Sequence, residues 1–249
     1  MSRSPLRRNM IDRSRRLARP VLRLLHGGHE HFCPLCESGL RRFVPFGLNP
    51  RDAARCPVCG ALERHRMAWS FLRQRTDLFQ RPGLKLLHFA PEPILESLLR
   101  RIPRLDFLTA DLSDPRAMAR IDITDIPFPE ASFDAIFCSH VLEHVPDDRL
   151  AMQELRRVLK PGGWIALQVP ISGETTFEDP GVTDPAERVR LFGQDDHVRV
   201  YGRDIAGRLE SAGFTVTEVR PGDLFEETER RRVGIPEDEL LHECRTVIP

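Results

Sequence analysis

The sequence predicts an α/β protein in which a small metal-bound module precedes a mostly parallel sheet covered by helices on both faces. Two observations carry this prediction. From residue 84 onward, strand-like apolar runs alternate with helical patterns, as they do in parallel sheets. Before residue 67, four of the six cysteines form two C-x-x-C pairs. A chain of 249 residues is long enough for both units.

The predicted elements of the sheet domain follow one another with turn signals between them. Strand character is found at residues 84–90, 105–112, 119–123, 133–142, 164–170, 214–219 and 241–248. Helical periodicity is found at residues 91–102, 147–159 and 203–213. The Lys160-Pro161-Gly162-Gly163 run is expected to end the second helix before the next strand begins. The last strand is expected to lie at an edge of the sheet.

Composition excludes an integral membrane protein. Hydrophobic residues make up 41% of the chain and charged residues 30%, and no apolar run approaches the ~20 residues of a membrane span. Residues 1–31 hold eight arginines, so we expect a flexible basic leader, with peripheral contact to anionic lipid or another polyanion as the alternative. These arginines interrupt any signal-peptide core, which predicts a cytoplasmic protein.

The paired cysteines, Cys33, Cys36, Cys56 and Cys59, form the most specific motif. The two pairs are 19 residues apart, which is typical of a four-thiolate zinc ribbon, here predicted over residues 32–66. Four sulfurs leave no open position on the ion, so the zinc is expected to be structural. Iron at the same site and a redox dithiol are the alternatives. Residues 67–83 are then a helical linker to the domain at 84–249.

The turn after the first strand of the sheet lacks the glycines of a dinucleotide site. It reads Ala90-Pro91-Glu92, whereas a pyrophosphate needs backbone amides brought close by a G-x-G-x-x-G turn. Pro91 removes one amide donor and Glu92 would repel phosphate, which disfavours NAD, FAD and ATP. S-adenosylmethionine has no phosphate and carries two positive charges, so it suits an acidic turn. The alternative is that Glu92 only stabilises the positive end of the next helix.

An acid at the end of the second strand supports a nucleoside ligand, because Asp111 can accept hydrogen bonds from both ribose hydroxyls. Two later stretches are more specific: I-D-I-T-D-I-P-F-P-E-A-S-F-D-A-I-F-C-S-H-V-L-E-H-V-P-D-D and E-L-R-R-V-L-K-P-G-G-W-I-A-L-Q-V-P. They closely resemble class I S-adenosylmethionine-dependent methyltransferases of the type 11 group. The resemblance covers about residues 84–220 and implies a Rossmann-like sheet of seven strands.

The resemblance also implies which residues bind the methyl donor. Asp111 would bind the ribose, and Leu112 would also contact the donor. Asp122 would meet the adenine amino group with Ile123 beside the ring, and Cys138, Ser139 and His140 would line the methionine end. His88, Ala90 and Glu92 stand where family members usually carry an acid and two glycines, and they would complete the methionine side. Because the chain departs from the family at all three positions, these contacts are the weakest part of the implied donor site.

Polar residues outside the donor positions are candidates for the acceptor side. His197 is the preferred general base, and His140 and His144 are further catalytic candidates, although each could only donate a hydrogen bond or pack. The predicted acceptor-binding residues are Arg64, Arg66, Arg199 and Tyr201. The segment 172–201 lacks periodicity, so we expect a mobile loop that becomes ordered over the substrate.

The resulting hypothesis is a methyltransferase that acts on a small-molecule or glycan-type acceptor. The glycan class depends on C-P-V-C-G-A-L-E-R-H-R together with L-H-F-A-P-E, a combination that resembles a bacterial subgroup of these enzymes linked to surface-glycan genes. The first alternative is a ribosomal RNA base methyltransferase, because such enzymes also carry an N-terminal zinc module. An aromatic content of 7% offers few platforms for base stacking. The second alternative is a non-catalytic scaffold that binds protein through the ribbon, although Asp111 and Asp122 argue against it.

Overall fold

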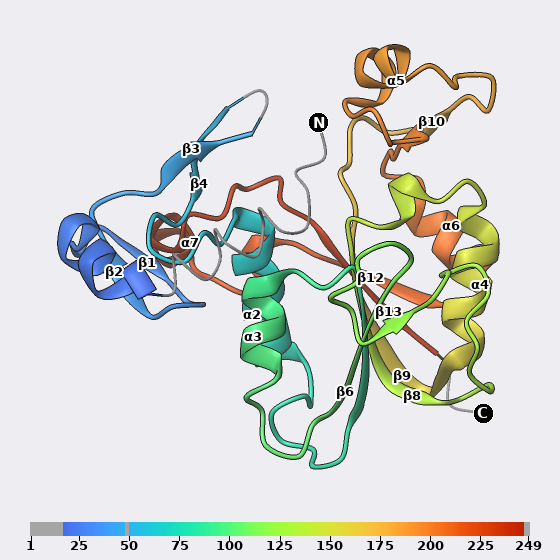
Figure 1. Ribbon diagram of the computed structural model, residues 1–249, viewed down its shortest axis with the longest axis horizontal. Coiled ribbons are helices and arrows are strands. Elements are labelled where there is room, and N and C mark those ends of the chain that lie inside the picture. The colour runs from blue at the N-terminus through green and yellow to red at the C-terminus, as the bar shows by residue number, and fades with distance from the viewer. Residues whose placement is uncertain (1–16, 48–49, 247–249) are drawn as a thin grey trace. The chain divides into compact units, whose positions relative to one another are not determined.

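The computed structural model describes residues 17–47 and 50–246, which form two compact units (Figure 1). The first unit contains the chain up to Pro82 together with Glu92–Pro103 and Arg220–Leu240. The second contains Gly83–Pro91, Arg104–Val219 and the chain from Leu241 onward. The sequence prediction placed residues 84–249 in one domain, so the structure differs by moving residues 92–103 and 220–240 to the cysteine-rich unit.

Short hairpins and helices make up the first unit. Its strands are β1 (His31–Cys33), β2 (Ser38–Leu40), β3 (Val44–Phe46) and β4 (Arg51–Arg55). Its helices are α2 (Glu63–Arg75), α3 (Pro93–Leu99) and α7 (Glu227–Val233), with a 3-10 turn, η2 (Pro221–Asp223). β1 pairs with β2 and β3 with β4, both antiparallel. Because β1 ends at one cysteine pair and β4 ends just before the other, the hairpins position all four thiols.

The predicted basic leader lies partly outside the described residues, which begin at residue 17. Residues 17–26 are helical. Arg23 donates hydrogen bonds from Nε to Ser38 Oγ at 3.0 Å and from Nη2 to the Cys36 carbonyl at 2.6 Å. This described part of the leader is therefore attached to the β1–β2 hairpin.

The second unit contains the predicted seven-stranded sheet, in the order β12-β13-β9-β8-β5-β6-β7. The strands are β5 (Lys85–Phe89), β6 (Asp106–Asp111), β7 (Ala119–Arg120), β8 (Phe133–Ser139), β9 (Leu159–Gln168), β12 (Thr215–Val219) and β13 (Leu241–Arg245). Helices α4 (Asp148–Val158) and α6 (Ile205–Ser211) lie on one face of it (Figure 1). The α/β class and the seven strands predicted from the sequence are confirmed.

One hydrophobic core joins this face of the sheet to the two helices. Leu87, Phe89 and Ile136 from the strands are at most 2% exposed, as are Leu155 of α4 and Leu209 of α6. Each such side chain contributes roughly 1.5–3 kcal/mol relative to an exposed one. No helix in residues 17–47 and 50–246 combines the length and the apolar character needed to cross a bilayer.

Two details of the sheet differ from the prediction. β9 already begins at Leu159, because Pro161 disfavours the helical conformation at Lys160 and the chain becomes extended early enough for Leu159 to pair with Phe133. A Cβ at Gly163 would lie 2.8 Å from the Asp134 carbonyl oxygen, so only glycine fits where β9 passes β8. The last strand, β13, is not an edge strand, since it lies antiparallel between β12 and β9.

The segment 172–201 is organised rather than irregular. It contains β10 (Phe177–Glu178), α5 (Pro185–Phe192) and β11 (Arg199–Val200), and β10 pairs with β11. α5 begins with the Asp184 carboxylate accepting the Glu187 amide at 2.9 Å, and it ends at Gly193 with a φ of 87°. The prediction of an unstructured loop missed these elements because each is too short to show a period.

Candidate functional site

The carboxyl ends of β5, β6, β7 and β8 meet at one edge of the sheet, because these strands run parallel. Two residues that follow them, Ala90 after β5 and His140 after β8, have left-handed φ angles of 48° and 55°. Such a conformation costs a non-glycine residue roughly 1–2 kcal/mol. Ala90 thus occupies a backbone position that favours glycine, and its amide bonds the Ala110 carbonyl at 2.9 Å.

Asp111 is the last residue of β6 and fixes the turn that follows it. Its Oδ1 accepts the amides of Ser113 and Asp114, both at 2.7 Å. Within the described parts of the chain, no group donates to its other oxygen, Oδ2. One oxygen therefore positions the side chain, and the other is free to accept a ligand hydroxyl. Leu112 beside it is 53% exposed.

Asp122 lies in the loop after β7, and the Ile121 amide connects this loop to the Asp111 carbonyl at 3.2 Å. Hydrogen bonds from the Thr124 hydroxyl and amide, at 2.7 and 2.9 Å, hold the pKa of Asp122 below its ordinary value. The side chain of Ile123 is 4% exposed and belongs to the hydrophobic core. Of the two predicted adenine contacts, only Asp122 is exposed.

Two further predicted donor contacts are enclosed by the sheet. His88 is fully buried, with its ring 4.9 Å from that of Phe137, because it lies inside β5 rather than at its end. Ser139, the last residue of β8, is 3% exposed and its Oγ lies 3.4 Å from Gln168 Oε1. The structure thus places His88 in the packing of the sheet and Ser139 at the strand end.

Glu92 forms an ion-pair cluster with the segment after the last paired cysteine. Its Oε1 accepts from Arg64 Nε at 3.1 Å and from His65 Nε2 at 2.8 Å. His65 Nδ1 accepts the Leu62 amide at 3.0 Å, so the proton of the neutral ring is on Nε2. This pairing connects the E-R-H-R segment to Glu92. It also supports the alternative that Glu92 has a structural role at the start of α3.

Arg66 lies inside the first unit, where it is fully buried. Its Nη1 donates to the carbonyls of Ala54 and Ala61, and its Nη2 to that of Gly234 at 2.6 Å. The guanidinium also lies 4.0 Å from the centre of the Phe43 ring. Arg66 therefore connects parts of its own unit. The sequence analysis had predicted that it binds the acceptor.

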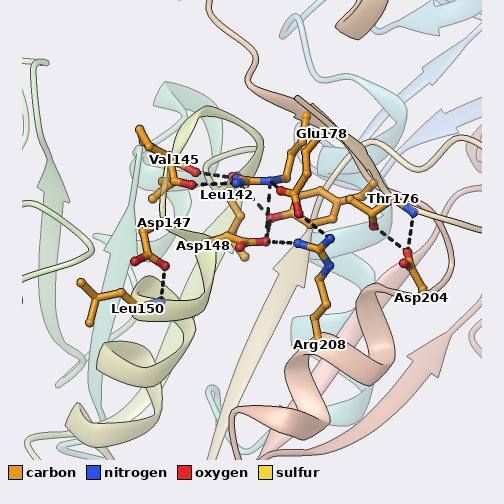
Figure 2. A network of polar contacts seen from close by, with 12 residues as sticks. Leu142, Val145, Asp147, Asp148, Leu150, Thr176, Glu178, Asp204 and Arg208 are labelled. Carbon is orange, nitrogen blue, oxygen red and sulfur yellow. Dashed lines mark hydrogen bonds and ion pairs between the residues drawn. The ribbon is translucent and has the colours of Figure 1, made fainter. Parts of the chain in front are cut away.

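Arg199 and Tyr201 are likewise buried, in a polar network of the second unit that includes Asp148, Glu178 and Arg208 (Figure 2). Arg199 donates from Nε to Glu178 Oε2 at 2.9 Å and from its terminal nitrogens to the carbonyls of Leu142, Val145 and Pro146 at 2.5–2.9 Å. These bonds hold β11 against the start of α4. The sequence analysis, by contrast, predicted that Arg199 binds the acceptor.

The other members of the network also bind one another. The Tyr201 hydroxyl donates to Asp148 Oδ2 at 2.7 Å, and burial followed by the charge of Asp148 raises its pKa. Arg208 donates to Asp148 at 3.1 Å and to Glu178 at 2.8 Å. Hydrogen bonds from Arg208 and Arg199, opposed by partial burial, lower the pKa of Glu178 to about 2. Arg199 and Tyr201 are thus buried, and their hydrogen bonds connect β10 and β11 to residues 142–148.

Glu143, His144 and His197, which we name the Glu-His-His cluster, converge after β8. Each offers one ligand atom, and these atoms lie within 4.8 Å of one another. His140 is adjacent, with Nδ1 3.1 Å from Glu143 Oε1. Burial raises the pKa of Glu143, but the contact with His140 outweighs it and the pKa is lowered. Burial, and then the charge of His144, lower the pKa of His197. The structure thus brings together all three predicted catalytic histidines.

Glu143, by contrast, was not predicted as a site residue. It stands next to His144, which was named as a catalytic candidate. The available signal was the E-H dipeptide directly after a buried strand end, where ligand-binding residues of parallel sheets gather.

The four paired cysteines converge as predicted. Cys33 Sγ lies 3.6 Å from Cys59 Sγ, and Cys36 Sγ lies 3.8 Å from Cys56 Sγ. All four ligand atoms lie within 4.8 Å of one another. Sulfurs placed tetrahedrally about 2.3 Å from one ion are about 3.8 Å apart, so the observed spacing suits a single Zn²⁺.

Comparison with known proteins shows that this chain is similar to methyltransferases. Residues 102–167 match the family model described as a methyltransferase domain. The 27-O-demethylrifamycin SV methyltransferase of Amycolatopsis mediterranei is 30% identical over 142 residues, which are 53% of this chain and 50% of that protein. A probable S-adenosylmethionine-dependent methyltransferase of Mycolicibacterium smegmatis is 30% identical over 132 residues, 50% of this chain and 48% of that protein. The chain thus spans about half the length of these relatives.

Two solved structures share the fold. An S-adenosylmethionine-dependent methyltransferase from Mesorhizobium loti superposes with a TM-score of 0.52 at 15% identity, covering 74% of this chain and 98% of that one. The 1,6-didemethyltoxoflavin-N1-methyltransferase of Burkholderia thailandensis, solved with 1,6-didemethyltoxoflavin and S-adenosylhomocysteine, superposes with a TM-score of 0.51 at 16% identity, covering 74% and 78%.

Proposed function

We propose that this chain, which carries a class I S-adenosylmethionine-dependent methyltransferase domain, transfers the methyl group of S-adenosylmethionine to a small-molecule acceptor. The observation that carries the proposal is the methyltransferase family match over residues 102–167, which begins before β6 and ends within β9. It therefore spans three predicted donor ligands: Asp111 and Ser139 at the ends of β6 and β8, and Asp122 in the loop after β7.

On the donor side, Asp111 is the best-prepared residue. Its Oδ1 is held by two amides, which leaves Oδ2 to accept ribose hydroxyls without a rearrangement of the turn. The carboxylate of Asp122 is exposed and its charged form is favoured by the Thr124 hydrogen bonds, so it can accept a hydrogen bond from the adenine amino group. The donor itself supplies an activated methyl group on a sulfonium. The protein has to position the acceptor and remove its proton, and a general base contributes typically ~10²–10⁴-fold.

On the acceptor side, the Glu-His-His cluster with His140 offers the basic groups. The small-molecule class is supported by the relatives, since one is named for a rifamycin and a structural neighbour for a toxoflavin precursor. A glycan-type acceptor is the finer prediction, based on the combination of C-P-V-C-G-A-L-E-R-H-R with L-H-F-A-P-E. Neither Arg66 nor Arg199 is available to bind an anionic group of such an acceptor, because both side chains are enclosed within their own units.

We also propose that Cys33, Cys36, Cys56 and Cys59 hold one structural Zn²⁺. The sulfur spacing fits a tetrahedral thiolate site, and four protein ligands leave no place for a substrate. The metal would therefore stabilise the first unit and take no part in methyl transfer.

A transfer assay tests the function directly. The protein is incubated with donor carrying a labelled methyl group and, separately, with small metabolites, soluble glycans or ribosomal RNA from cells. We expect label in the small-molecule or glycan fraction, together with stoichiometric S-adenosylhomocysteine. Label confined to RNA would contradict the proposed acceptor class and favour the RNA alternative. No transfer to any fraction, from a protein that binds the donor, would favour the scaffold.

A further inference from the structure

The Glu-His-His cluster is built from two separate segments. Glu143 and His144 belong to a 3-10 turn, η1 (Leu142–His144), directly after β8, and His197 precedes β11. The Val198 amide donates to the Glu143 carbonyl at 2.9 Å and fixes the two segments together. Glu143 is 1% and His197 4% exposed, whereas the His144 side chain is 34% exposed. The cluster is thus buried on one side and open on the other.

The hydrogen bonds of both histidines determine which ring nitrogen is free. His197 Nδ1 lies 3.1 Å from the Phe192 carbonyl, and His144 Nδ1 lies 3.3 Å from the Asp196 carbonyl. A carbonyl only accepts, so each Nδ1 carries the proton and each Nε2 keeps a lone pair in the neutral ring. Metal-binding histidines are oriented in this way, by a backbone carbonyl at the nitrogen that does not bind the ion.

The buried acceptors of the cluster are poorly satisfied. His197 Nε2 and Glu143 Oε2 have no hydrogen-bond partner among residues 17–47 and 50–246. Glu143 Oε1 approaches only His140 Nδ1, at 3.1 Å and without hydrogen-bond geometry. A buried carboxylate and a buried lone pair each cost free energy unless a donor or a cation meets them. One ligand atom from each of Glu143, His144 and His197 lies within 4.8 Å of the other two, and a cation placed among them would meet the unsatisfied acceptors of Glu143 and His197.

We propose that Glu143, His144 and His197 bind one divalent transition-metal ion through a carboxylate oxygen and two imidazole Nε2 atoms. Two histidines and one carboxylate are a ligand set that suits Zn²⁺ or Fe²⁺, and three protein ligands leave at least one position open. As an extension that rests on the proposed function, an oxygen of the acceptor would occupy the open position.

Cobalt(II) is a suitable probe, because its visible absorption reports the ligands that it binds. Protein whose cysteine site is already loaded with zinc is titrated with Co²⁺, and each sample is checked for folding by circular dichroism. We expect one equivalent to bind with d–d bands but without a near-ultraviolet thiolate charge-transfer band. His144→Ala, at a half-exposed position, and Glu143→Gln should weaken this binding about 100-fold or more. His29→Ala, which removes an exposed histidine of the first unit, should bind like the wild type.

Three outcomes would overturn the proposal: no cobalt binding by folded wild-type protein, a thiolate band as the only signal, or unchanged affinity in both cluster variants. Donor binding is measured on the same samples by calorimetry and does not require this metal. Cobalt binding without donor binding would uphold the metal site and contradict the proposed function. The reverse result would contradict the metal site alone.

Discussion

Replacing Cys56 with serine is expected to unfold the first unit while the seven-stranded sheet stays folded. The described strands of this unit are three to five residues long and form two separate hairpins, which cannot bury enough apolar surface alone. Zinc binding contributes about 10–16 kcal/mol in zinc-finger peptides, comparable to the whole stability of a small domain. Losing one of four thiolates should therefore remove most of the free energy that keeps β1–β4 in place.

Hydrogen exchange with mass spectrometry measures this result by segment. Peptides covering β1–β4 should lose protection in Cys56→Ser, and also in wild-type protein treated with a strong chelator, while peptides covering β8 and β9 keep it. Metal analysis should show that the bound zinc is lost in both cases. Cys244→Ala is the matched control, since it removes a buried cysteine of the second unit. Full protection of β1–β4 after zinc removal would mean that the metal is dispensable.

Replacing Arg199 with methionine is expected to lower the free energy of unfolding of the second unit by about 3–5 kcal/mol. The substitution leaves the Leu142, Val145 and Pro146 carbonyls without their donor and removes one of the two arginines that neutralise Glu178. Buried acceptors that lose their partner cost more than the hydrogen bond itself contributed. Methionine keeps much of the volume, so the loss reports polar contacts rather than a cavity.

Arg203→Met is the control, because Arg203 pairs with Glu174 at 3.5 Å where both side chains are exposed, and such pairs contribute about 0–1 kcal/mol. Urea unfolding followed by far-ultraviolet circular dichroism compares the variants. If Arg199 bound the acceptor, as its position in the sequence suggested, Arg199→Met would lower methyl transfer and leave stability unchanged. Equal stabilities of the two variants would therefore contradict the structural role.

The sequence predicted the sheet well because each strand is encoded locally. The runs around β5, β8 and β9 are apolar and bounded by turn residues, so their existence and type follow from short-range chemistry. The place of β13 between β12 and β9 could not be predicted in this way, because strand order depends on contacts between distant segments. The same holds for residues 220–240, which follow a predicted strand but pack with the cysteine-rich unit.

In the candidate site, too, side-chain contacts between distant segments could not be predicted from the local sequence. The strand ends and the family resemblance place Asp111 and Asp122 at the carboxyl edge of the sheet, and their contacts with the donor stay a prediction. Arg66 and Arg199 looked like ligand-binding groups because arginine is usually exposed, but their partners are carbonyls up to 168 residues away, which no local pattern reveals. The clustering of the four cysteines could be predicted because the spacing of two C-x-x-C pairs is typical of a four-thiolate site.

Donor binding measured by isothermal titration calorimetry tests the central claim most directly. Asp111→Asn keeps the oxygen that accepts the Ser113 and Asp114 amides but replaces the free oxygen with a donor, so the turn should persist while ribose binding fails. We expect wild-type protein to bind S-adenosylmethionine. Asp111→Asn should bind it at least about tenfold more weakly, which corresponds to a loss of about 1.4 kcal/mol or more in binding free energy. Asp106→Ala, at the other end of β6, should bind it as the wild type does. Folded wild-type protein that releases no heat with the donor, or an Asp111→Asn variant that binds as tightly as the wild type, would contradict the account.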